Sequence, residues 1–495
     1  MHRAWALALV FILVGNAQGA ILLPPDGKTL LIIGQDLESE WLYVTSGLFP
    51  DPAGVTAYIS FYDLLNTGFP QFGALGEDVY GNVLTYDVDW GAGPLHCHNA
   101  AYGYPNSTLQ VGLNIAEGNS GTIWHPDGLT QIAEGNRDAE IIRLATFFND
   151  LGNIPVYLRI GYEFDGRWND GYENHSSYIA AYRRIVDVLD SHGVDNVAYV
   201  WQSCTSPLDD LVEGYRENPL DWYPGDDYVD WVGISWFLLP DELPPLGGSP
   251  ATQRELADEM LTIARNLGKP TMIAESTPQG YHISQGMNAN ISSLWDGPAG
   301  EDVVSKTSEE IWNEWYATFF DYIHANSDVI RAVSYINCYW DSQPMWGPPY
   351  TSGFWGDTRV QADAAITELW LLELSDGLWL HGSPELFDLL LNPSTGVESA
   401  GGPFCLQVSQ PLPNPSPGVS TVHFSLRSSE YVEAVVFDVR GRRVRTLISD
   451  QLFPGDHSVR WDGKGMEGNK MPAGSYLLLL RTDAGLTSRK LILLD

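Results

Sequence analysis

Two glutamates, Glu163 and Glu275, have the residue type and the setting for acid–base and nucleophilic chemistry. Glu163 ends the apolar run that begins at Val156, and Glu275 ends a shorter apolar run that begins at Thr271. Each run is typical of a buried β-strand, and loop residues follow both. A protonated carboxyl can give a proton to a leaving oxygen while an ionised one attacks the neighbouring carbon. If the fold brings both glutamates to one rim, the pair predicts cleavage of a glycosidic bond.

The neighbours of the two glutamates predict different protonation states. Tyr162 and Trp168 give Glu163 apolar surroundings, which raise the pKa of a carboxyl and suit a general acid/base. Arg159 is expected to orient Glu275 and keep it ionised, as a nucleophile requires; the alternative is a purely structural ion pair, which would add little stability. The distance between the carboxyls would separate two outcomes, about 5–5.5 Å for retention of configuration and about 6.5–9.5 Å for inversion.

Eight strand-like runs alternate with helical patterns along the chain. The runs are Thr29–Gly34, Val55–Phe61, Leu109–Ile115, Val156–Glu163, Val197–Gln202, Trp231–Trp236, Thr271–Glu275 and Ala332–Tyr339. The helical patterns, with apolar residues at three- and four-residue spacing, are Asp138–Asn149, Ser177–Ser191, Gln253–Leu267, Ser308–Asn326 and Val360–Leu374. This alternation predicts an α/β fold with a parallel sheet, and eight strands close such a sheet into a (β/α)8 TIM barrel.

Strand alternation predicts which side chains point toward the barrel axis. In the run from Val156, the inward set is Tyr157, Arg159, Gly161 and Glu163. In the run from Thr271, the inward set is Thr271, Ile273 and Glu275, and the outward set is Met272 and Ala274. Both glutamates then lie at the carboxyl ends of their strands, the face on which barrel active sites are built.

Further side chains near the strand ends are candidates for binding sugar. They are Trp168, Trp201, Trp236, Asn337, Tyr339 and Trp340. Flat rings offer large apolar contact area and Asn337 could bond a hydroxyl, but packing at the rim would explain each ring equally well. His96 and His98 resemble a metal-binding pair on a strand. No third ligand follows nearby, so neither a metal nor a cofactor is predicted.

Charge is distributed unevenly along the chain. The net charge is -37, from 26 basic and 63 acidic residues, whereas the segment from Ser409 onward has 11 basic and 9 acidic residues. The shift predicts a domain boundary near Ser409. An acidic surface repels phosphates, so nucleic acid is not expected as a partner, and neutral polysaccharides are favoured over anionic ones.

The two ends of the chain predict export and a second domain. Residues 1–19 read as a signal peptide, and no later run approaches the ~18 apolar residues of a membrane span. A secreted or cell-surface protein of bacterial type is therefore expected, with a barrel domain over 20–400 and a Pro-rich linker over 401–420. Four short alternating runs then predict a small all-β sandwich over 421–495. The spacing of the four cysteines indicates no disulfide framework.

The first domain resembles glycoside hydrolase family 26 and the wider clan of retaining (β/α)8 glycosidases. The residues that carry the resemblance are Arg159, Glu163, Asp165-Gly166, Trp168, Tyr199–Trp201, Tyr228–Asp230, Val232-Gly233, Lys269-Pro270 and Glu275. The resemblance spans roughly Asp138 to Asp341 and implies that Glu163 is the general acid/base and Glu275 the nucleophile. Tyr162 stands where that family usually has His, which leaves the substrate open.

The second domain resembles Ig-like C-terminal domains of bacterial secreted proteins, including type IX secretion sorting domains and the flagellar hook-capping Ig domain. The resemblance rests on Pro413-Asn414-Pro415, Val435–Arg442, Val444–Leu447, His457–Gly463, Ala473–Tyr476 and Arg489–Leu491. It implies a role with secretion machinery or in cell-surface attachment rather than in catalysis.

The sequence as a whole predicts a secreted glycoside hydrolase that cleaves a β-linked, neutral polysaccharide by a two-glutamate retaining mechanism. An endo-acting mannanase, glucanase or xylanase would fit. Two alternatives stay open at this point: a carbohydrate-binding protein on a barrel scaffold that has lost catalysis, and a transglycosylase in which a sugar hydroxyl replaces water.

Overall fold

A computed structural model of the chain describes fifteen stretches of its 495 residues. They are residues 22–62, 74–78, 80–118, 125–207, 218–241, 251–289, 303–351, 353–391, 409, 411–426, 429–438, 443–453, 455–466, 468–482 and 485–494. The predicted signal peptide, residues 401–408 of the predicted linker and Cys405 lie outside the described residues.

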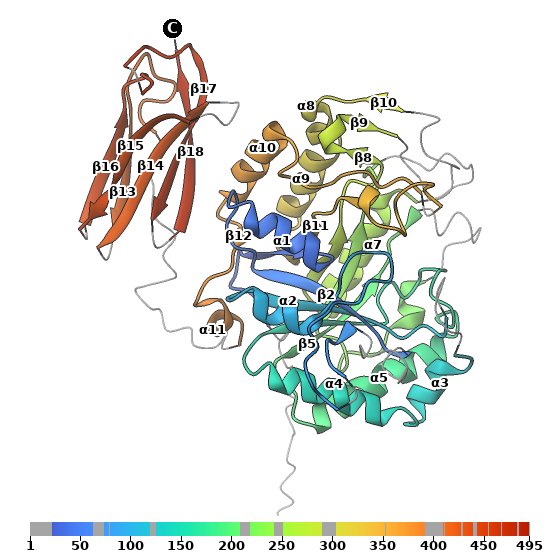
Figure 1. The fold of residues 1–495 in the computed structure, drawn as a ribbon. Helices are drawn as coiled ribbons and strands as arrows, with labels where there is room; N and C mark the ends of the chain where they lie inside the picture. Colours follow the sequence, from blue (N-terminus) through green and yellow to red (C-terminus); the bar gives the residue numbers. More distant parts are fainter. Residues whose placement is uncertain are drawn as a thin grey trace, which may run out of the picture.

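The eight predicted strands form a closed parallel barrel (Figure 1). They are β1 (Thr29–Gly34), β2 (Gly54–Ser60), β3 (Thr108–Asn114), β4 (Val156–Ile160), β5 (Val197–Ser203), β6 (Trp231–Trp236), β7 (Thr271–Ser276) and β11 (Ile330–Ile336). Neighbouring strands pair in chain order, and β11 pairs with β1 to close the ring. The prediction of a (β/α)8 TIM barrel is confirmed.

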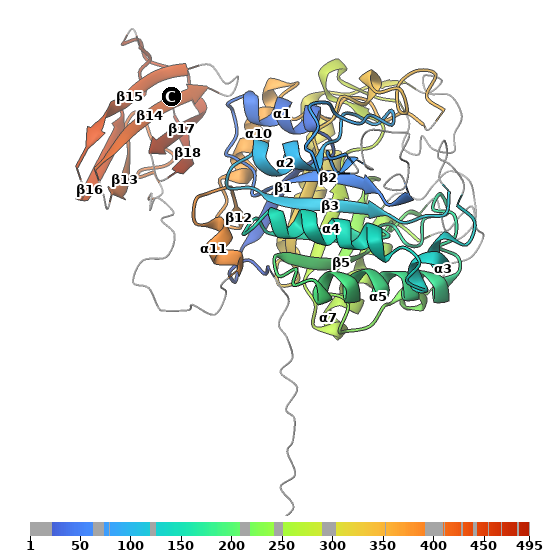
Figure 2. The same ribbon diagram turned by 60° about the horizontal axis from the view of Figure 1, so that its bottom comes forward.

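Helices surround this barrel on its outer side, as Figure 2 shows for α4, α5 and α7. The described helices are α1 (Leu37–Thr45), α2 (Cys97–Gly103), α3 (Gly128–Ala133), α4 (Asp138–Asp150), α5 (His175–Ser191), α7 (Gln253–Leu267), α8 (Ser308–Ile311), α9 (Ala317–Ala325), α10 (Ala364–Leu374) and α11 (Leu386–Leu391). The helix predicted over Ser308–Asn326 is divided by a π-helical turn, η5 (Trp312–Tyr316). None of the described helices has the length and apolarity needed to cross a membrane.

Several short strands and turns are added to the barrel. A small antiparallel sheet consists of β8 (Tyr281–His282), β9 (Met287–Asn288) and β10 (Val304–Ser305). Strand β12 (Trp379–Leu380) pairs with β1. The 3-10 turns are η3 (Pro219–Trp222), η4 (Ile283–Gln285) and η6 (Trp340–Ser342). The β8–β10 sheet follows β7 directly, so it lies at the end of the strand that carries Glu275.

Helix α7 illustrates how the sequence fixes these elements. Thr252 accepts a hydrogen bond from the backbone N–H of Glu255, whose side chain bonds back to the N–H of Thr252, and this capping box begins the helix. Its apolar face is then buried in the main core cluster at Ala257, Met260 and other positions three and four residues apart. Gly268 ends the helix at φ +66°, a conformation that costs glycine little.

The amino-terminal segment closes the bottom of the barrel. The Arg331 guanidinium, 7% exposed, donates to the backbone carbonyls of Pro24 (2.7 Å), Pro25 (2.6 Å) and Lys28 (3.0 Å). The hydroxyl of Tyr157, inside the barrel, donates to the carbonyl of Leu22 at 2.6 Å. These bonds hold the segment at the amino ends of β4 and β11, opposite the rim that carries the glutamates.

The predicted alternation holds for β4 and fails for β7. Outward residues of β4 pack with the helices, and Tyr157 joins the cluster inside the barrel, as predicted. On β7 the prediction was wrong: Met272 and Ala274 lie in that inner cluster, and Ile273 lies in the helix-facing one.

A β-bulge explains the failure. Ile234 of β6 pairs with Ile273, but the next residue, Ser235, pairs with Glu275, so Ala274 is an extra residue on β7. The side chain of Gln110 donates to the carbonyl oxygen of this residue, Ala274, at 2.9 Å. Glu275 therefore points inward because of the bulge and not because of strict alternation.

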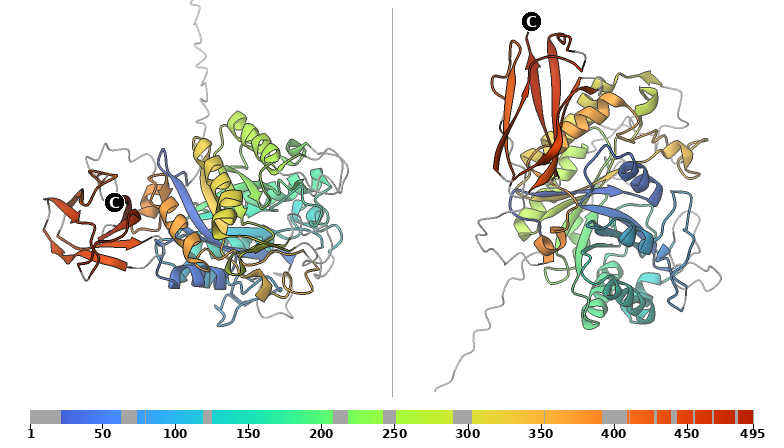
Figure 3. Two further views of the ribbon diagram at one scale, coloured as in Figure 1. Left: turned by 90° about the horizontal axis from the view of Figure 1, so that it is seen from above. Right: turned by 60° about the vertical axis from the view of Figure 1, so that its left-hand side comes forward.

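The carboxyl-terminal domain consists of two antiparallel sheets, visible in both views of Figure 3. One sheet holds β13 (Ser420–Leu426) and β16 (Gly455–Trp461); the other has the order β15 (Arg443–Leu452), β14 (Glu430–Asp438), β17 (Gly474–Thr482), β18 (Gly485–Leu493). Their inner faces form a separate apolar core that includes Phe424, Val436 and Trp461. The predicted sandwich is confirmed, with β15 and β18 in addition to the four predicted runs.

Part of the predicted linker belongs to this sandwich. Asn414 bonds strand β18 twice: its side-chain N–H donates to the carbonyl of Lys490 at 2.8 Å, and its side-chain oxygen accepts from the N–H of Ile492 at 2.7 Å. The N–H of Ser416 donates to the carbonyl of Ile492 at 2.8 Å. Residues 414–416 are thus part of the second domain, and the 401–420 linker was predicted too long.

Candidate active site

Glu163 lies just beyond β4 in an unusual backbone conformation. Its φ is +53°, in the left-handed region that non-glycine residues rarely occupy. Its carbonyl oxygen accepts hydrogen bonds from the side chain of Asn169 and the N–H of Gly166, both at 2.9 Å. Such strained residues persist where surrounding contacts hold them, and they cluster at functional sites.

The carboxyl group of Glu163 is nearly buried and accepts two hydrogen bonds. The hydroxyl of Ser235 donates to Oε1 at 2.8 Å, and the indole N–H of Trp168 donates to Oε2 at 3.1 Å. Burial, and next the negative charge of Glu275, raise the pKa of Glu163 to about 8, although the Ser235 hydrogen bond opposes the shift. A carboxyl in this environment holds its proton at neutral pH, as a general acid must.

Glu275 has the opposite environment, because a fixed cation contacts it. Arg159 is fully buried, and its Nη1 donates to Oε1 of Glu275 at 2.5 Å and to Oε1 of Gln202 at 2.8 Å. A guanidinium stays protonated in proteins, and this contact is an ion pair. The structure places Arg159 in contact with Glu275, and the charges of both act on Glu163.

Two tyrosines complete the surroundings of Arg159. Its guanidinium lies 5.0 Å from the ring centre of Tyr58 and 5.1 Å from that of Tyr162, within the range of cation–π attraction. The two rings meet edge to face at 5.5 Å. Sequence reasoning missed Tyr58, although its place on β2, in the inward parity with Thr56, was a usable signal.

Two of the tryptophans predicted to bind sugar cannot do so. Trp201 and Trp236 are fully buried between the strands and the helices. Trp201 stacks on Phe164 at 4.6 Å with an interplanar angle of 6°, and Trp236 packs on Tyr322 at 4.7 Å. Both prediction errors have one cause. These side chains occupy outward positions on β5 and β6, and they pack in the core between the strands and the helices.

Asn337 and Trp340 are likewise structural. Asn337 is fully buried; its side-chain oxygen accepts from the N–H of Val360 at 2.9 Å, and its side-chain N–H faces the carbonyl of Ser39 at 3.4 Å. Trp340 is 2% exposed, and its indole N–H donates to the hydroxyl of Thr358 at 3.0 Å. Both side chains are buried and bonded within the protein, so the prediction that they bind sugar is wrong for both.

Trp168 and Tyr339 remain candidates for sugar binding because both are partly exposed. Trp168 is joined to the acid/base candidate by its hydrogen bond to Glu163. The ring of Tyr339 lies 4.6 Å from the guanidinium of Arg359 and 5.9 Å from the ring of His282, at the end of β11.

The histidine pair considered as a metal site has protein partners instead. His96 caps α2, its Nδ1 accepting from the N–H of Asn99 at 3.1 Å, so the pair does not lie on a strand as predicted. His98 contacts Glu77 at 2.6 Å, and Glu77 also pairs with Arg143. Within the described stretches, no group of three or more His, Cys, Asp or Glu side chains could hold a metal ion. Cys97, Cys204 and Cys338 are buried.

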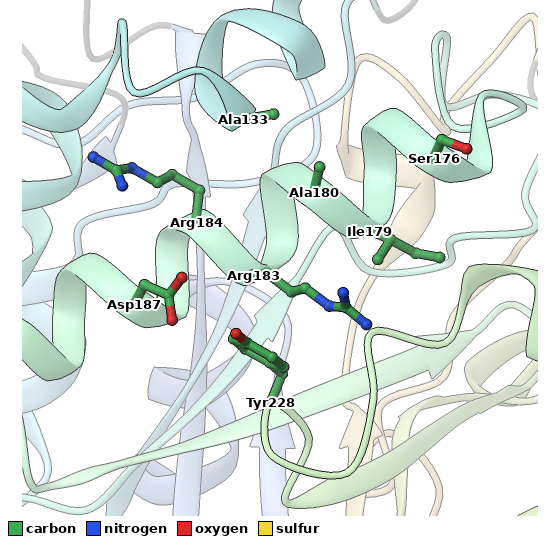
Figure 4. A pocket seen from close by; sticks show the side chains of 8 residues that line it. All are labelled: Ala133, Ser176, Ile179, Ala180, Arg183, Arg184, Asp187 and Tyr228. Carbon is green, nitrogen blue, oxygen red and sulfur yellow. The ribbon is translucent and has the colours of Figure 1, made fainter.

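A shallow hollow on the outside of the barrel is not part of this site (Figure 4). Helix α5 supplies most of its lining, which comprises Ala133, Ser176, Ile179, Ala180, Arg183, Arg184, Asp187 and Tyr228. Its arginines are engaged in packing: Arg184 pairs with Asp138, and Arg183 donates to the carbonyl of Pro224 at 2.6 Å.

Known proteins resemble both domains. The model of glycosyl hydrolase family 26 matches residues 129–244, and that of the FlgD Ig-like domain matches residues 417–484. Beta-1,3-xylanase TXYA of a Vibrio species is 33% identical over 371 residues, which cover 74% of this chain and 68% of that protein. A beta-1,3-xylanase of an Alcaligenes species is 33% identical over 368 residues, covering 74% of this chain and 67% of that one.

Among solved structures, GH26C of a Muricauda species has a TM-score of 0.45 and 15% identity, covering 73% of this chain and 90% of that one. The two xylanases are matched over more than two thirds of their own length, and the family model covers β4, β5 and β6. The chain is a glycoside hydrolase, and it belongs to glycosyl hydrolase family 26.

Proposed function

We propose that this protein is a secreted, retaining hydrolase of a neutral β-linked polysaccharide, with Glu163 as acid/base and Glu275 as nucleophile. The observation that carries the proposal is the contrast between the two carboxyls. Glu275 is bound to a buried guanidinium at 2.5 Å, whereas the pKa of Glu163 is raised to about 8 by burial and by the charge of Glu275. Unequal carboxyls facing one another are the requirement for glycoside cleavage.

The geometry supports a two-step reaction. In the first step, Glu163 gives its proton to the glycosidic oxygen as that bond breaks, and a Glu275 oxygen bonds to the anomeric carbon. The resulting ester carries no charge on Glu275, so one of the causes that raise the pKa of Glu163 disappears. The pKa of Glu163 falls, which suits it to take a proton from the water that hydrolyses the ester in the second step.

Beta-1,3-xylan is the first substrate to test, since two relatives with 33% identity are named as enzymes acting on it. The net charge of -37 supports a neutral polymer, because an acidic surface repels anionic chains. Secretion is supported by the composition of residues 1–19, and a role in export or attachment by the Ig-like domain.

The test is a reducing-sugar assay on β-1,3-xylan, β-1,4-xylan, β-1,4-mannan and β-1,3-glucan, with NMR of the first product anomer. Release from β-1,3-xylan above the other three, with the β-anomer formed first, is the expected result. Glu275→Gln should lower the rate by at least ~1,000-fold while leaving binding intact. Preferential release from another polymer would refute the substrate, and an initial α-anomer would refute the retaining mechanism.

A further inference from the structure

We infer that Gln202 and Ser235 form a directional hydrogen-bond relay from Arg159 to Glu163, and that these two side chains position the acid/base. Nη1 of Arg159 donates to Oε1 of Gln202 at 2.8 Å. Nε2 of Gln202 donates to Oγ of Ser235 at 3.0 Å, and this hydroxyl donates to Oε1 of Glu163 at 2.8 Å. The inference rests on the proposed role of Glu163.

The direction of the relay follows from its chemistry. A guanidinium has no acceptor, so the Gln202 atom that faces Arg159 must be the carbonyl oxygen. The amide nitrogen of Gln202 then faces Ser235, and because this nitrogen only donates, the Ser235 oxygen must accept. The single hydroxyl hydrogen of Ser235 is therefore directed to Glu163. In this way the Arg159 guanidinium determines that Ser235 is a hydrogen-bond donor to Glu163.

The fold holds both relay residues in place. Gln202 and Ser235 are fully buried at the ends of neighbouring strands β5 and β6. Gly233 makes room for the relay, since a Cβ there would lie 2.7 Å from Cβ of Gln202. The carbonyl of Ser235 accepts from the hydroxyl of Thr205 and from the side chain of Gln253, the latter at 3.2 Å. Buried side chains with satisfied partners keep one orientation.

The relay stabilises the ionised form of Glu163 through the Ser235 hydrogen bond. Oε1 of Glu163 accepts the Ser235 hydrogen, and Oε2 accepts the indole N–H of Trp168. A hydrogen bond donated to a carboxylate favours its ionised form. Ser235 therefore limits how far the pKa of Glu163 rises, so that the same group can act as a base after the first step.

Four other titratable or charged groups face Glu163, and none replaces this donor. Glu275 reaches it from β7 and Arg159 from β4, while Asp165 and Tyr162 come from the segment after β4. The carboxylates of Glu275 and Asp165 raise the pKa of Glu163, and Arg159 lowers it. Arg159 donates hydrogen bonds to Glu275 and Gln202, and its effect on Glu163 is that of its charge.

The test is the alkaline limb of the kcat/KM–pH profile, which reports the group that must be protonated. Ser235→Ala should move this limb upward by about one pH unit, because a donor to the ionised form is lost. Ser235→Thr keeps the hydroxyl and should restore the wild-type limb. Ser276→Ala is the matched control: Ser276 is equally buried on β7, but it donates to the carbonyl of Ser334 at 2.7 Å, and its removal should leave the limb in place.

A second variant tests the direction of the relay and serves if Ser235→Ala does not fold. In Gln202→Glu a carboxylate accepts from both Arg159 and Ser235, so the Ser235 hydrogen turns away from Glu163 and the limb moves upward. Adding Ser235→Ala to Gln202→Glu should then shift the limb no further. A limb that stays in place in Ser235→Ala or Gln202→Glu, or that moves as much in Ser276→Ala, would overturn the relay.

One control separates failure of the relay from failure of the proposed function. On an aryl glycoside whose leaving group needs no proton, Glu163→Gln should remain active and lose the alkaline limb. If the alkaline limb persists in Glu163→Gln, Glu163 is not the acid/base, and the inference of a relay that positions it is also wrong. If the limb disappears there but does not respond to Ser235→Ala, the relay alone is wrong.

Discussion

At the residue scale, the site depends on one buried cation that has two partners. Arg159 contacts Glu275 directly and reaches Glu163 through Gln202 and Ser235. A buried ion pair is a weak source of stability, because desolvation offsets most of its attraction. Its value lies in holding the Glu275 carboxyl group in one orientation beside Glu163, whose pKa is raised.

The raised pKa of Glu163 predicts the upper pH limit of activity. Catalysis requires the protonated form in the free enzyme, so kcat/KM should fall as pH rises through about 8. Steady-state kinetics over a broad pH range on a natural oligosaccharide would measure the limb. A decline that begins near pH 5, where an ordinary carboxyl loses its proton, would show that the burial of Glu163 does not set the profile.

A second buried carboxyl, Glu40 on α1, should affect stability rather than activity. One oxygen accepts the N–H of Thr56 at 3.0 Å, and the other is buried with no hydrogen-bond partner among the described residues. Burial, and next the charge of Asp36, raise the pKa of Glu40 well above its usual value. A raised native-state pKa favours folding fully below the unfolded-state pKa of about 4.3, and this contribution is lost as pH rises toward the native-state pKa.

Glu40→Gln should therefore become progressively more stable than wild type as pH rises from about 4.5 to 8, by up to ~1.4 kcal/mol per pH unit until the native-state pKa is reached. Melting temperatures of both proteins across this range would measure the effect. Glu38→Gln, on the exposed face of the same helix, is the matched control. A difference between Glu40→Gln and wild type that stays constant with pH would contradict the account.

At the element scale, strand periodicity predicted the barrel but not the β-bulge on β7. Eight apolar runs and the helical patterns between them sufficed for the fold, because closed parallel barrels bury every strand on both faces. The extra residue at Ala274 could not be predicted, since a bulge depends on pairing with β6 and not on β7 alone.

Other site features were accessible to the same alternation. Ala198 and Val200 of β5 face the barrel interior, so Gln202 shares their parity and points inward, whereas Trp201 points toward the helices. Applied to every strand, this rule would have found Gln202 and rejected Trp201. The structural role of Asn337 could not be predicted by this rule. One of its hydrogen-bond partners is in α1, far away in the sequence, and only the folded structure reveals it.

The segment that closes the barrel bottom makes a prediction about stability. Arg331→Ala removes three hydrogen bonds from a nearly buried guanidinium to backbone carbonyls, and it should destabilise the protein by about 1–3 kcal/mol. Because these contacts lie opposite the catalytic rim, kcat/KM at 25 °C should stay within about twofold of wild type. Urea unfolding and steady-state assays would measure both; a large loss of kcat/KM with unchanged stability would contradict this role.

At the scale of the whole molecule, the two domains have separate cores. The described apolar clusters of the barrel end at Leu391, and that of the sandwich begins at Val422. The uneven distribution of charge also indicates two domains, since the segment from Ser409 onward holds 9 of the 63 acidic residues. Both glutamates of the proposed reaction lie in the barrel, so the proposal requires no residue of the Ig-like domain for catalysis.

A chain truncated after residue 400 should keep kcat/KM within about twofold, since every residue placed at the site lies before it. Purified truncated and full-length proteins assayed on a soluble oligosaccharide would show this. Full loss of activity in a truncated protein that still unfolds cooperatively would mean that the Ig-like domain contributes to the site.

The most direct test of the central claim is covalent trapping of the nucleophile. A 2-deoxy-2-fluoro-β-glycoside with a good leaving group, incubated with wild-type enzyme, should add one sugar to Glu275, as peptide mass spectrometry would show. Glu163→Gln should accumulate the same adduct, because its attack step needs no acid with such a leaving group and its release step lacks a base. A sugar found on another residue, or turnover without an adduct and with inversion at the anomeric carbon, would contradict the account.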